Sequence, residues 1–518
     1  MAKSAAPQLR LRSTQHPVLY EVNASVVLQE CSASKGKTVS LGDLPETLID
    51  EWTSLGFDAV WLMGLWTRSE TSREIARTES TLQDEYRAAL PDVTPCDVMG
   101  SPYAIRSYRV APEFGGSAAL RHLRSRLARR GIGLVLDFVA NHTARDCEWV
   151  RSHPDWYING REGEEREHPD LFSVADTVKG RRVIAFGRDP MFPGWTDTAQ
   201  LNHRSLVART AIIKELERIS ALCDGVRCDM AMLLLNDVFQ HTWHNHLPVA
   251  PEDDAPAEFW KEAIAHVHAL HPDFLFLAES YWNREWDLQQ LGFQYTYDKT
   301  LYDRLLREGA SSVHDHLKAE LAYQKRSLRF LENHDEPRAA RVLPSEAWHF
   351  AAALVTFTVP GMALLHEGQM DGRLVRVPAQ LRRRPEEPLN ERCAGFYQEL
   401  LLAINNPVMR QGEWRLLECR AGWQDNYSWY NFLVFWWSHP SEGARMVVVN
   451  YGPQSGQCYV EVPLGEIEGG LIEFRDLLGP AVYVRDRLGL QSRGIYFDLP
   501  GYGIHLFEVS TVQKPTPA

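Results

Sequence analysis

The sequence has little of what marks a secreted, disulfide-bonded or membrane-spanning protein. Only eight cysteines occur in 518 residues, and they are scattered without a C-x-x-C pair. This usage argues against a disulfide framework and predicts reduced cysteines in the core. No run approaches the ~20 apolar residues that a membrane helix needs, and MAKSAAPQLRLRSTQH at the start lacks the apolar centre of a signal peptide. We therefore expect a cytoplasmic protein with no membrane partner.

The chain also lacks an excess of positive charge. Its formal net charge is −13 and its pI is ≈ 5.8, which argues against nucleic acid or an anionic membrane surface as the main partner. Hydrophobic residues make up 44% of the chain and aromatic residues 10%, so there is material for a large core. A chain of 518 residues exceeds a single core and predicts two or three domains.

Four segments of the chain are apolar runs that end in carboxylates, amides or histidines. They are LDFVANH (residues 136–142), CDGVRCDMAM (223–232), FLFLAES (274–280) and RFLENHD (329–335). Strands that are apolar throughout and polar only at the carboxyl end are typical of a parallel barrel with its active site at one rim. The pattern predicts an α/β fold built on a (β/α)8 TIM barrel.

Two of these segments carry carboxyl groups in contrasting surroundings. Arg227 and Asp229 are two residues apart, so they share one face of a strand, and the guanidinium can hold the carboxylate ionised and oriented. Glu279 follows an apolar run, and such an environment raises the pKa of a carboxyl group. Glycoside hydrolysis needs one ionised and one protonated carboxyl group. A lone Arg–Asp pair on a buried strand is also a common structural ion pair, so the other segments are needed to decide.

Together the four segments resemble the four ordered regions of the alpha-amylase superfamily, glycoside hydrolase family 13. The resemblance covers roughly residues 18–368, and the matched residues are Asp137, Asn141, His142, Gly225, Arg227, Asp229, Glu279, Asn333, His334 and Asp335. It implies that Asp229 is the nucleophile, that Glu279 is the general acid and base, and that Asp335 is a third acid on the sugar hydroxyls. It also implies that Arg227, His142 and His334 bind substrate. Asp137, Asn141 and Asn333 are expected to support the site.

Two further candidates for sugar contact come from flanking segments. SPYAIRSY (residues 101–108) resembles the family's G-Y-x-V-x-D-Y segment, which implies that Tyr103 forms the floor of the glucose subsite. Ala104 stands where many amylases have Asp. Trp282, three residues past Glu279, is expected either to stack on a sugar ring or to pack in the core.

We predict no metal and no other cofactor, with a structural calcium as the alternative. Some family members bind calcium through the asparagine that Asn141 matches and through acids of domain B. The sequence shows no acid-dense loop of the hard oxygen ligands that calcium prefers.

The resemblance and the pattern of expected helices and strands divide the chain into four parts. We expect a disordered leader at residues 1–16, a catalytic barrel (domain A) at 17–142 and 201–411, an inserted small domain B at 143–200, and a C-terminal β-sandwich (domain C) at 412–518. Short alternating strands predict the sandwich. Its aromatic cluster is expected to pack in the core rather than to bind sugar; the cluster comprises Trp429, Phe435, Trp436 and Trp437.

The implied function is a retaining hydrolase of α-glucosidic bonds that works through a covalent glycosyl-enzyme. Many starch-acting members place Lys and His where this chain has Met232 and Leu233, and long insertions (residues 69–95 and 372–388) are expected on the catalytic rim. These features predict a pocket for short α-glucans or α-glucosides. The alternative is a transglycosylase or sucrose-acting relative that moves a glucosyl or maltosyl unit. A non-catalytic glycan-binding relative is opposed by the presence of all three acids.

The three acids provide a direct test. Asp229→Asn and Glu279→Gln should each remove several orders of magnitude of turnover with the fold intact, because no neighbouring group can replace them. Asp335→Asn should reduce turnover nearly as much. Arg227→Lys should also abolish turnover, because Lys lacks the planar fork that orients a carboxylate. Turnover of maltooligosaccharides measures the loss of activity, and circular dichroism checks that each variant is folded. A variant that keeps about a tenth of the wild-type rate would contradict the assignment.

Overall fold

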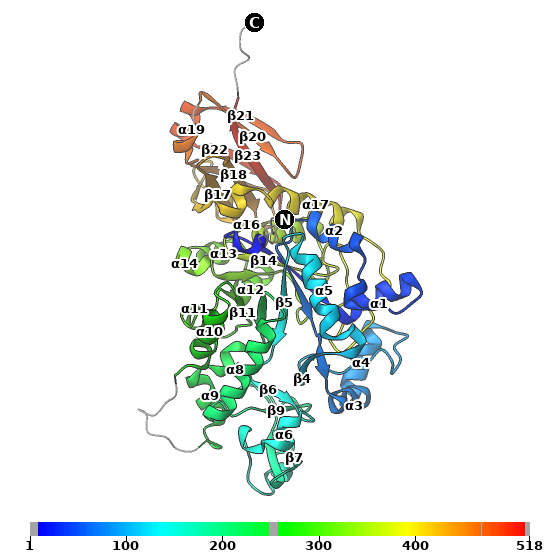
Figure 1. Ribbon diagram of the computed structural model, residues 1–518. Helices are drawn as coiled ribbons and strands as arrows, with labels where there is room; N and C mark the ends of the chain where they lie inside the picture. Colours follow the sequence, from blue (N-terminus) through cyan, green and yellow to red (C-terminus); the bar gives the residue numbers. More distant parts are fainter. Residues whose placement is uncertain (1–8, 248–256, 468, 513–518) are drawn as a thin grey trace, which may run out of the picture.

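Eight parallel strands close into a barrel in the computed structural model, which describes residues 9–247, 257–467 and 469–512 (Figure 1). The order around the barrel is β1-β14-β13-β12-β11-β10-β5-β2. The strands are β1 (Val18–Asn23), β2 (Ala59–Met63), β5 (Gly133–Phe138), β10 (Gly225–Cys228), β11 (Leu275–Ala278), β12 (Tyr295–Tyr297), β13 (Ser327–Arg329) and β14 (Met362–His366). The predicted TIM barrel is confirmed.

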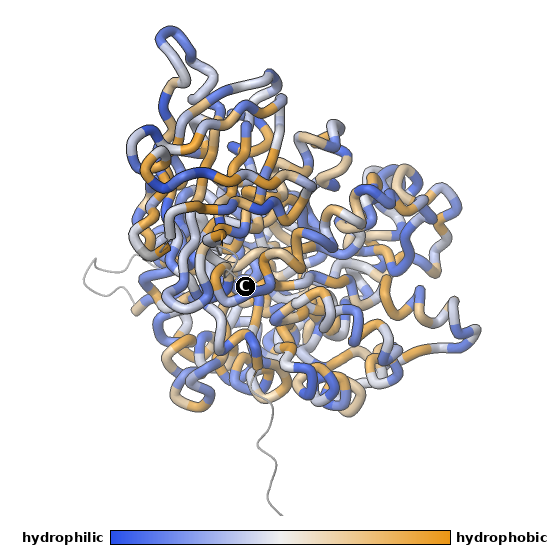
Figure 2. Tube along the Cα trace, turned by 90° about the horizontal axis from the view of Figure 1, so that it is seen from above, coloured by the Kyte–Doolittle hydropathy of each residue, from blue (hydrophilic) through white to orange (hydrophobic). Residues whose placement is uncertain are grey.

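The barrel strands are apolar on both faces because both faces are covered. Side chains such as Leu19, Val135 and Leu364 fill the interior, while the helices cover the outside. In the view from above, hydrophilic stretches gather at the outer turns and apolar stretches lie mostly inside (Figure 2). The helices of this region are α1 (Ala24–Lys35), α2 (Glu46–Ser54), α5 (Gly116–Ala128), α8 (Leu206–Ser220), α9 (Asn236–Trp243), α10 (Phe259–Leu270), α11 (Glu285–Gln290), α12 (Lys299–Arg307), α13 (Ala310–Leu317), α14 (Leu321–Gln324), α15 (Ala339–Val342), α16 (Glu346–Thr358), α17 (Glu391–Ile404) and α18 (Pro407–Gln411).

Part of the expected disordered leader is ordered. Residues 1–8 lie outside the described part of the chain, but residues 9–16 pack against the barrel and include a 3-10 helix, η1 (Arg10–Arg12). The His16 imidazole is buried and accepts a hydrogen bond from the Gly361 amide at 3.1 Å. Arg410 donates to the His16 carbonyl at 2.9 Å and pairs with Asp58 at 2.7 Å. These contacts are long-range in sequence, so the leader's composition did not predict them.

The insertion expected at residues 69–95 is largely helical rather than a loop. It forms α3 (Glu70–Thr78), which Ser69 caps by accepting from the Ser72 amide, and α4 (Ser80–Ala89). The strands β3 (Trp66–Arg68) and β4 (Ile105–Val110) pair at its base. A small apolar cluster joins the insertion to Leu381 in the loop after β14; its other members are Ala76, Tyr86, Leu90 and Val98. The two insertions therefore share one packed core.

The segment after β5 folds into short strands and helices of its own. Its elements are β6 (His142–Ala144), α6 (Glu148–Ser152), α7 (Glu164–Glu167), β7 (Phe172–Thr177), β8 (Gly180–Ala185) and β9 (Thr198–Gln200). β6 pairs antiparallel with β9, which brings the two ends of the segment together at the barrel rim. β7 and β8 form a hairpin. The segment begins and ends where domain B was expected.

The C-terminal part is a sandwich of two antiparallel sheets. The six-stranded sheet contains β15 (Glu413–Leu417), β17 (Phe432–His439), β18 (Gly443–Asn450), β23 (Ile504–Thr511), β20 (Leu471–Asp476) and β21 (Val482–Asp486). The three-stranded sheet contains β16 (Cys419–Arg420), β19 (Gly456–Val460) and β22 (Ile495–Leu499), and α19 (Arg487–Arg493) precedes β22. Alternate residues of β17 face opposite ways: Phe435 and Trp437 pack on the barrel, and Trp436 packs inside the sandwich. Core packing of these three residues is confirmed, whereas Trp429 is half-buried.

All eight cysteines lie in the described residues and none is in a disulfide. Cys223, just before β10, and Cys228, its last residue, are both buried. No helix in the described ranges is long and apolar enough to cross a membrane.

Candidate active site

One guanidinium joins the two candidate catalytic carboxylates at the end of β10. Arg227 donates through Nη1 to Asp229 Oδ1 at 2.7 Å, and its Nη2 lies 2.8 Å from Glu279 Oε2. The side chains of Arg227, Asp229 and Glu279 are 1%, 8% and 4% exposed, so water screens these charges little. Because both oxygens bind the same planar group, the two carboxyl groups are necessarily close.

Three aromatic rings lie close to the Arg227 guanidinium. Its carbon lies 5.3 Å from the ring centre of Trp61, 5.2 Å from that of Tyr103 and 5.8 Å from that of Tyr297. Such rings attract a cation and exclude water at the same time. The rings therefore hold the arginine between the carboxylates that follow β10 and β11.

Glu279 accepts two hydrogen bonds in addition to its ion pair with Arg227. Its Oε2 accepts a hydrogen bond from the Met230 amide at 2.6 Å, and its Oε1 accepts one from the Tyr281 hydroxyl at 3.0 Å. Burial raises the pKa of Glu279 to about 7; the charge of Arg227 opposes this rise, and the charges of Asp229 and Asp335 add to it. A carboxyl group with this pKa holds its proton near neutral pH and can donate it.

Asp335 differs from the other two acids because it reaches into open space. Its side chain is 51% exposed, and its Oδ2 lies 3.0 Å from His334 Nε2. Desolvation raises the pKa of Asp335, but the charge and hydrogen bond of His334 outweigh it and hold that pKa below the usual range. Asp335 is therefore ionised throughout the range in which Glu279 titrates.

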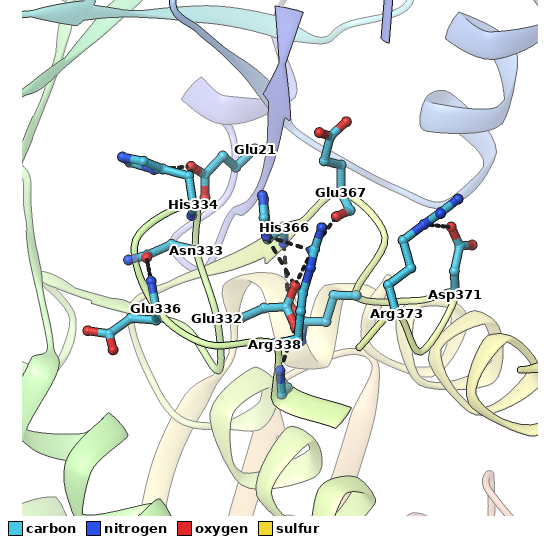
Figure 3. Close-up of polar contacts among 12 residues, drawn as sticks. Glu21, Glu332, Asn333, His334, Glu336, Arg338, His366, Glu367, Asp371 and Arg373 are labelled. Atoms are coloured by element: carbon cyan, nitrogen blue, oxygen red, sulfur yellow. Dashed lines mark hydrogen bonds and ion pairs between the residues drawn. The ribbon is translucent and has the colours of Figure 1, made fainter. Parts of the chain in front are cut away.

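His334 is anchored by Glu21 of β1, a residue for which the sequence analysis had no role. Nδ1 of His334 lies 2.6 Å from Glu21 Oε1, and Nε2 lies 2.6 Å from the Tyr103 hydroxyl (Figure 3). Burial lowers the pKa of His334, but Asp335 and Glu21 together raise it to about 10. The imidazole is thus a fixed cation beside Asp335.

Hydrogen bonds and a buried ion pair hold the loop that carries Asn333, His334 and Asp335. Asn333 Oδ1 accepts from the backbone amides of Asp335 and Glu336, both at 2.9 Å, which sets the turn. Below it, a buried carboxylate, Glu332, accepts from Arg338 at 2.6 Å (Figure 3). The candidate substrate-binding groups therefore stand on a rigid support.

Asp137 is buried next to the site, and Tyr103 lies at the surface of the cavity. The Asp137 carboxylate accepts from Trp61 Nε1 at 3.0 Å and from the Gly64 amide at 2.8 Å. Burial raises its pKa to about 6 despite the charge of Arg227. Asp137 bonds to protein groups and does not line the cavity, whereas Tyr103 does.

The three acids open into a cavity of about 570 Å³. Tyr103 and His142 line it, with Trp195 and Asp197 from the segment before β9. The two insertions supply a further wall, which consists of Ser72, Ile75, Ala76, Glu79, Leu82 and Gln380. Trp282 does not belong to the lining and is 39% exposed, so it does not pack in the core, and stacking on a sugar ring stays a prediction.

The wall is braced on both sides. Arg383 of the loop after β14 bonds Asp97 at 3.1 Å and Asp92 at 2.9 Å. On the other side, the Ser72 hydroxyl donates to Asp197 at 2.6 Å. Met232 and Leu233, expected near the leaving side of the substrate, are instead buried in the core and do not reach the cavity.

Comparison with known proteins identifies the family of the chain. The family model "Alpha amylase, catalytic domain" matches residues 46–432. The chain belongs to the alpha-amylase family. Alpha-amylase MalA of Haloarcula japonica is 23% identical over 333 residues, which are 63% of this chain and 40% of that protein. The 1,4-alpha-glucan branching enzyme GlgB of Corynebacterium jeikeium is 28% identical over 271 residues, 49% of this chain and 33% of that protein.

A maltosyltransferase is also similar: alpha-1,4-glucan:maltose-1-phosphate maltosyltransferase 2 of Streptomyces coelicolor is 24% identical over 262 residues, 47% of this chain and 30% of that protein. The chain thus spans two fifths or less of the length of these relatives. Among solved structures, an alpha-amylase from Lactobacillus plantarum superposes with a TM-score of 0.64 at 20% identity, covering 96% of this chain and 99% of that one. This last likeness shows the fold alone.

The calcium that some alpha-amylase family members hold does not fit the groups present here. Gln200 Nε2 donates to the Asn141 side-chain oxygen at 3.0 Å and to the Asn141 carbonyl at 2.9 Å. The oxygens that would face a cation thus already accept from an amide. In the described ranges there is also no group of three or more His, Cys, Asp or Glu residues placed to hold a metal. This amide pair links the end of β9 to the barrel rim at Asn141.

Sequence reasoning missed several residues that bond or pack against the candidate site groups. Glu21, Tyr281 and Met230 bond the candidate catalytic or binding groups, and Trp195 packs 5.1 Å from the His142 ring. Of these, Glu21 carried a usable signal, because it is a carboxylate inside the apolar first strand. Nothing in the sequence singled out the others.

The raised pKa of Glu279 predicts the basic limb of the pH profile. Glu279 must be protonated to donate, so kcat/KM on maltotriose should fall about tenfold per pH unit as the pH rises above about 7. The measurement is kcat/KM between pH 5 and 9. Glu279→Gln has no such proton, so its residual activity should show no basic limb near pH 7. An unchanged limb in that variant would assign the ionisation to another group.

Proposed function

We propose that the protein is a retaining glycoside hydrolase that cleaves α-glucosidic bonds in short α-glucans or α-glucosides. The observation that carries the proposal is the single buried guanidinium of Arg227 that bonds both Asp229 and Glu279 beneath the cavity. Retaining enzymes need their two carboxyl groups about 5–5.5 Å apart, and inverting enzymes need room for a water between them. Two carboxylates on one guanidinium leave little such room.

The roles follow from the surroundings of each acid. Asp229, bound to Arg227, attacks the anomeric carbon and forms the glycosyl-enzyme. Glu279, protonated near neutral pH, gives its proton to the leaving oxygen and then takes one from the incoming water. Asp335, ionised beside the His334 cation, binds sugar hydroxyls and stabilises the oxocarbenium-like transition state. Tyr103, His142 and His334 orient the ring.

Transfer to an acceptor other than water is the second candidate. The observation that favours it is the apolar part of the cavity lining, formed by Ile75, Leu82, Pro193 and Trp195 beside the acids. Such a wall disfavours water and can seat an acceptor. The product ratio of transfer to hydrolysis at high maltose or sucrose concentration separates the two reactions.

Stereochemistry tests the retaining mechanism. Proton NMR of the first product from maltotriose should show the α anomer before mutarotation. Azide then assigns the roles: Glu279→Ala should yield the α-glucosyl azide and Asp229→Ala the β-glucosyl azide, because azide replaces water in the first case and the nucleophile in the second. A β anomer as the first product of the wild type would overturn the mechanism.

Substrate length tests the enclosed pocket. The wall built by the two insertions should make kcat/KM level off or decline along a maltooligosaccharide series, with soluble starch a poor substrate. Arg383→Ala removes the ion pairs that brace the wall and should narrow the difference between short and long substrates. Arg87→Ala breaks an exposed pair within α4 and is the matched control. Efficiency that climbs with length, together with internal cuts in starch, would contradict the pocket.

A further inference from the structure

The two oxygens of the Glu279 carboxyl group have different partners. Its Oε2 accepts a hydrogen bond from the Met230 amide at 2.6 Å and lies 2.8 Å from Arg227 Nη2. Both partners are donors with no lone pair that could accept a hydrogen bond. A proton on Oε2 would point at their hydrogens, so the proton of neutral Glu279 belongs on Oε1. The geometry thus decides which oxygen can act as the general acid.

The hydroxyl of Tyr281, two residues further along the same loop, donates to Glu279 Oε1 at 3.0 Å. Burial raises the pKa of Tyr281 well above its usual value, and the charge of Glu279 adds to this rise. The phenol therefore keeps its proton across the range in which Glu279 titrates. An oxygen that carries a proton can still accept a hydrogen bond. Because a lone pair of Oε1 faces Tyr281, the proton on Oε1 points away from that hydroxyl, and Glu279 lines the cavity.

Backbone strain is concentrated at the two segments that supply these donors. Met230 has a φ of 42°, and Trp282 and Asn283, which directly follow Tyr281, have φ values of 62° and 59°. They are three of the five non-glycine residues with positive φ in residues 9–247, 257–467 and 469–512. L-amino acids disfavour this left-handed region, and residues held in it cluster at functional sites. The fold therefore keeps the Met230 amide and the Tyr281 hydroxyl in place at a conformational cost.

Four other titratable groups lie around Glu279. They come from three further segments of the barrel rim and are Arg227, Asp229, Tyr297 and Asp335. In the described part of the chain, none of these four side chains has a hydrogen bond to Oε1. Tyr281 is therefore the protein group that sets the direction of the proton on this oxygen.

We infer that Tyr281 is a positioning residue that keeps the transferable proton of Glu279 on Oε1 and directs it into the cavity. The inference rests on the proposed function, because it concerns the general-acid step. In that step the O–H bond at Oε1 breaks while a new O–H bond forms at the leaving oxygen, and Tyr281 retains its own proton. The Tyr281 hydrogen bond then stabilises the negative charge on Oε1 until Glu279 takes a proton from the incoming water.

Tyr281→Phe removes only the hydroxyl and tests this role with two substrates. Maltotriose needs a protonated leaving oxygen, whereas the fluoride of α-glucosyl fluoride leaves with little help from an acid. At pH 6, kcat/KM of the variant should fall about tenfold on maltotriose and less than about twofold on α-glucosyl fluoride. A donor to the carboxylate favours its ionised form, so loss of the hydroxyl should also raise the pKa of Glu279 and move the basic limb to higher pH.

Tyr451→Phe is the matched control. It removes a buried hydroxyl that donates to the Leu305 carbonyl at 2.6 Å, outside the cavity lining. It should change neither the ratio between the two substrates nor the pH profile. Replacement of Tyr281 by 3-fluorotyrosine keeps the ring and makes the hydroxyl a stronger donor, so the basic limb should then move to lower pH.

The outcomes separate the inference from the proposed function. An equal loss on both substrates with an unmoved basic limb would show that Tyr281 only stabilises the fold, and full activity of Tyr281→Phe would also overturn the inference; both results leave the proposed function standing. If Tyr281→Phe does not fold, the 3-fluorotyrosine protein decides, and an unmoved limb overturns the inference. A wild-type protein that cleaves neither substrate would overturn the proposed function and the inference with it.

Discussion

The contact on which the site depends is the pairing of one buried arginine with two carboxylates from adjacent strands. Burying Arg227 is costly unless its charge is matched, and Asp229 and Glu279 supply that match at 2.7 and 2.8 Å. The register of β10 against β11, with Arg227 opposite Leu277, brings the two carboxylates to the same guanidinium. The barrel thus balances its own buried charge with the groups that the reaction requires.

A second group of buried and partly buried charges lies near the first, around His334. His334 is held as a cation between Glu21 and Asp335, so a carboxylate, an imidazolium and a second carboxylate follow one another from the barrel interior to the cavity. Opposing shifts follow from this arrangement: burial raises the pKa of Glu279, while His334 lowers that of Asp335. Two acids of similar chemistry thereby take different protonation states in one cavity.

The two insertions modify how a substrate reaches this centre, and the C-terminal sandwich packs on the barrel. The helices α3 and α4 pack on Leu381 and are braced by Arg383, which makes them a wall with its own core. The six-stranded sheet buries one face on the barrel and the other inside the sandwich.

The sequence by itself determined the barrel, the sandwich and the identity of the polar groups at the strand ends, because strand period and burial are local properties of the chain. Asp229, Glu279 and His334 were found in this way. Only the tertiary structure decided the partners that come from distant strands, such as Glu21 beside His334, and the exposure of Trp282. It also decided that residues 69–95 form a helical wall, since contacts with a segment almost 300 residues away stabilise it. Such contacts depend on how the strands close into a barrel, and no local pattern encodes that.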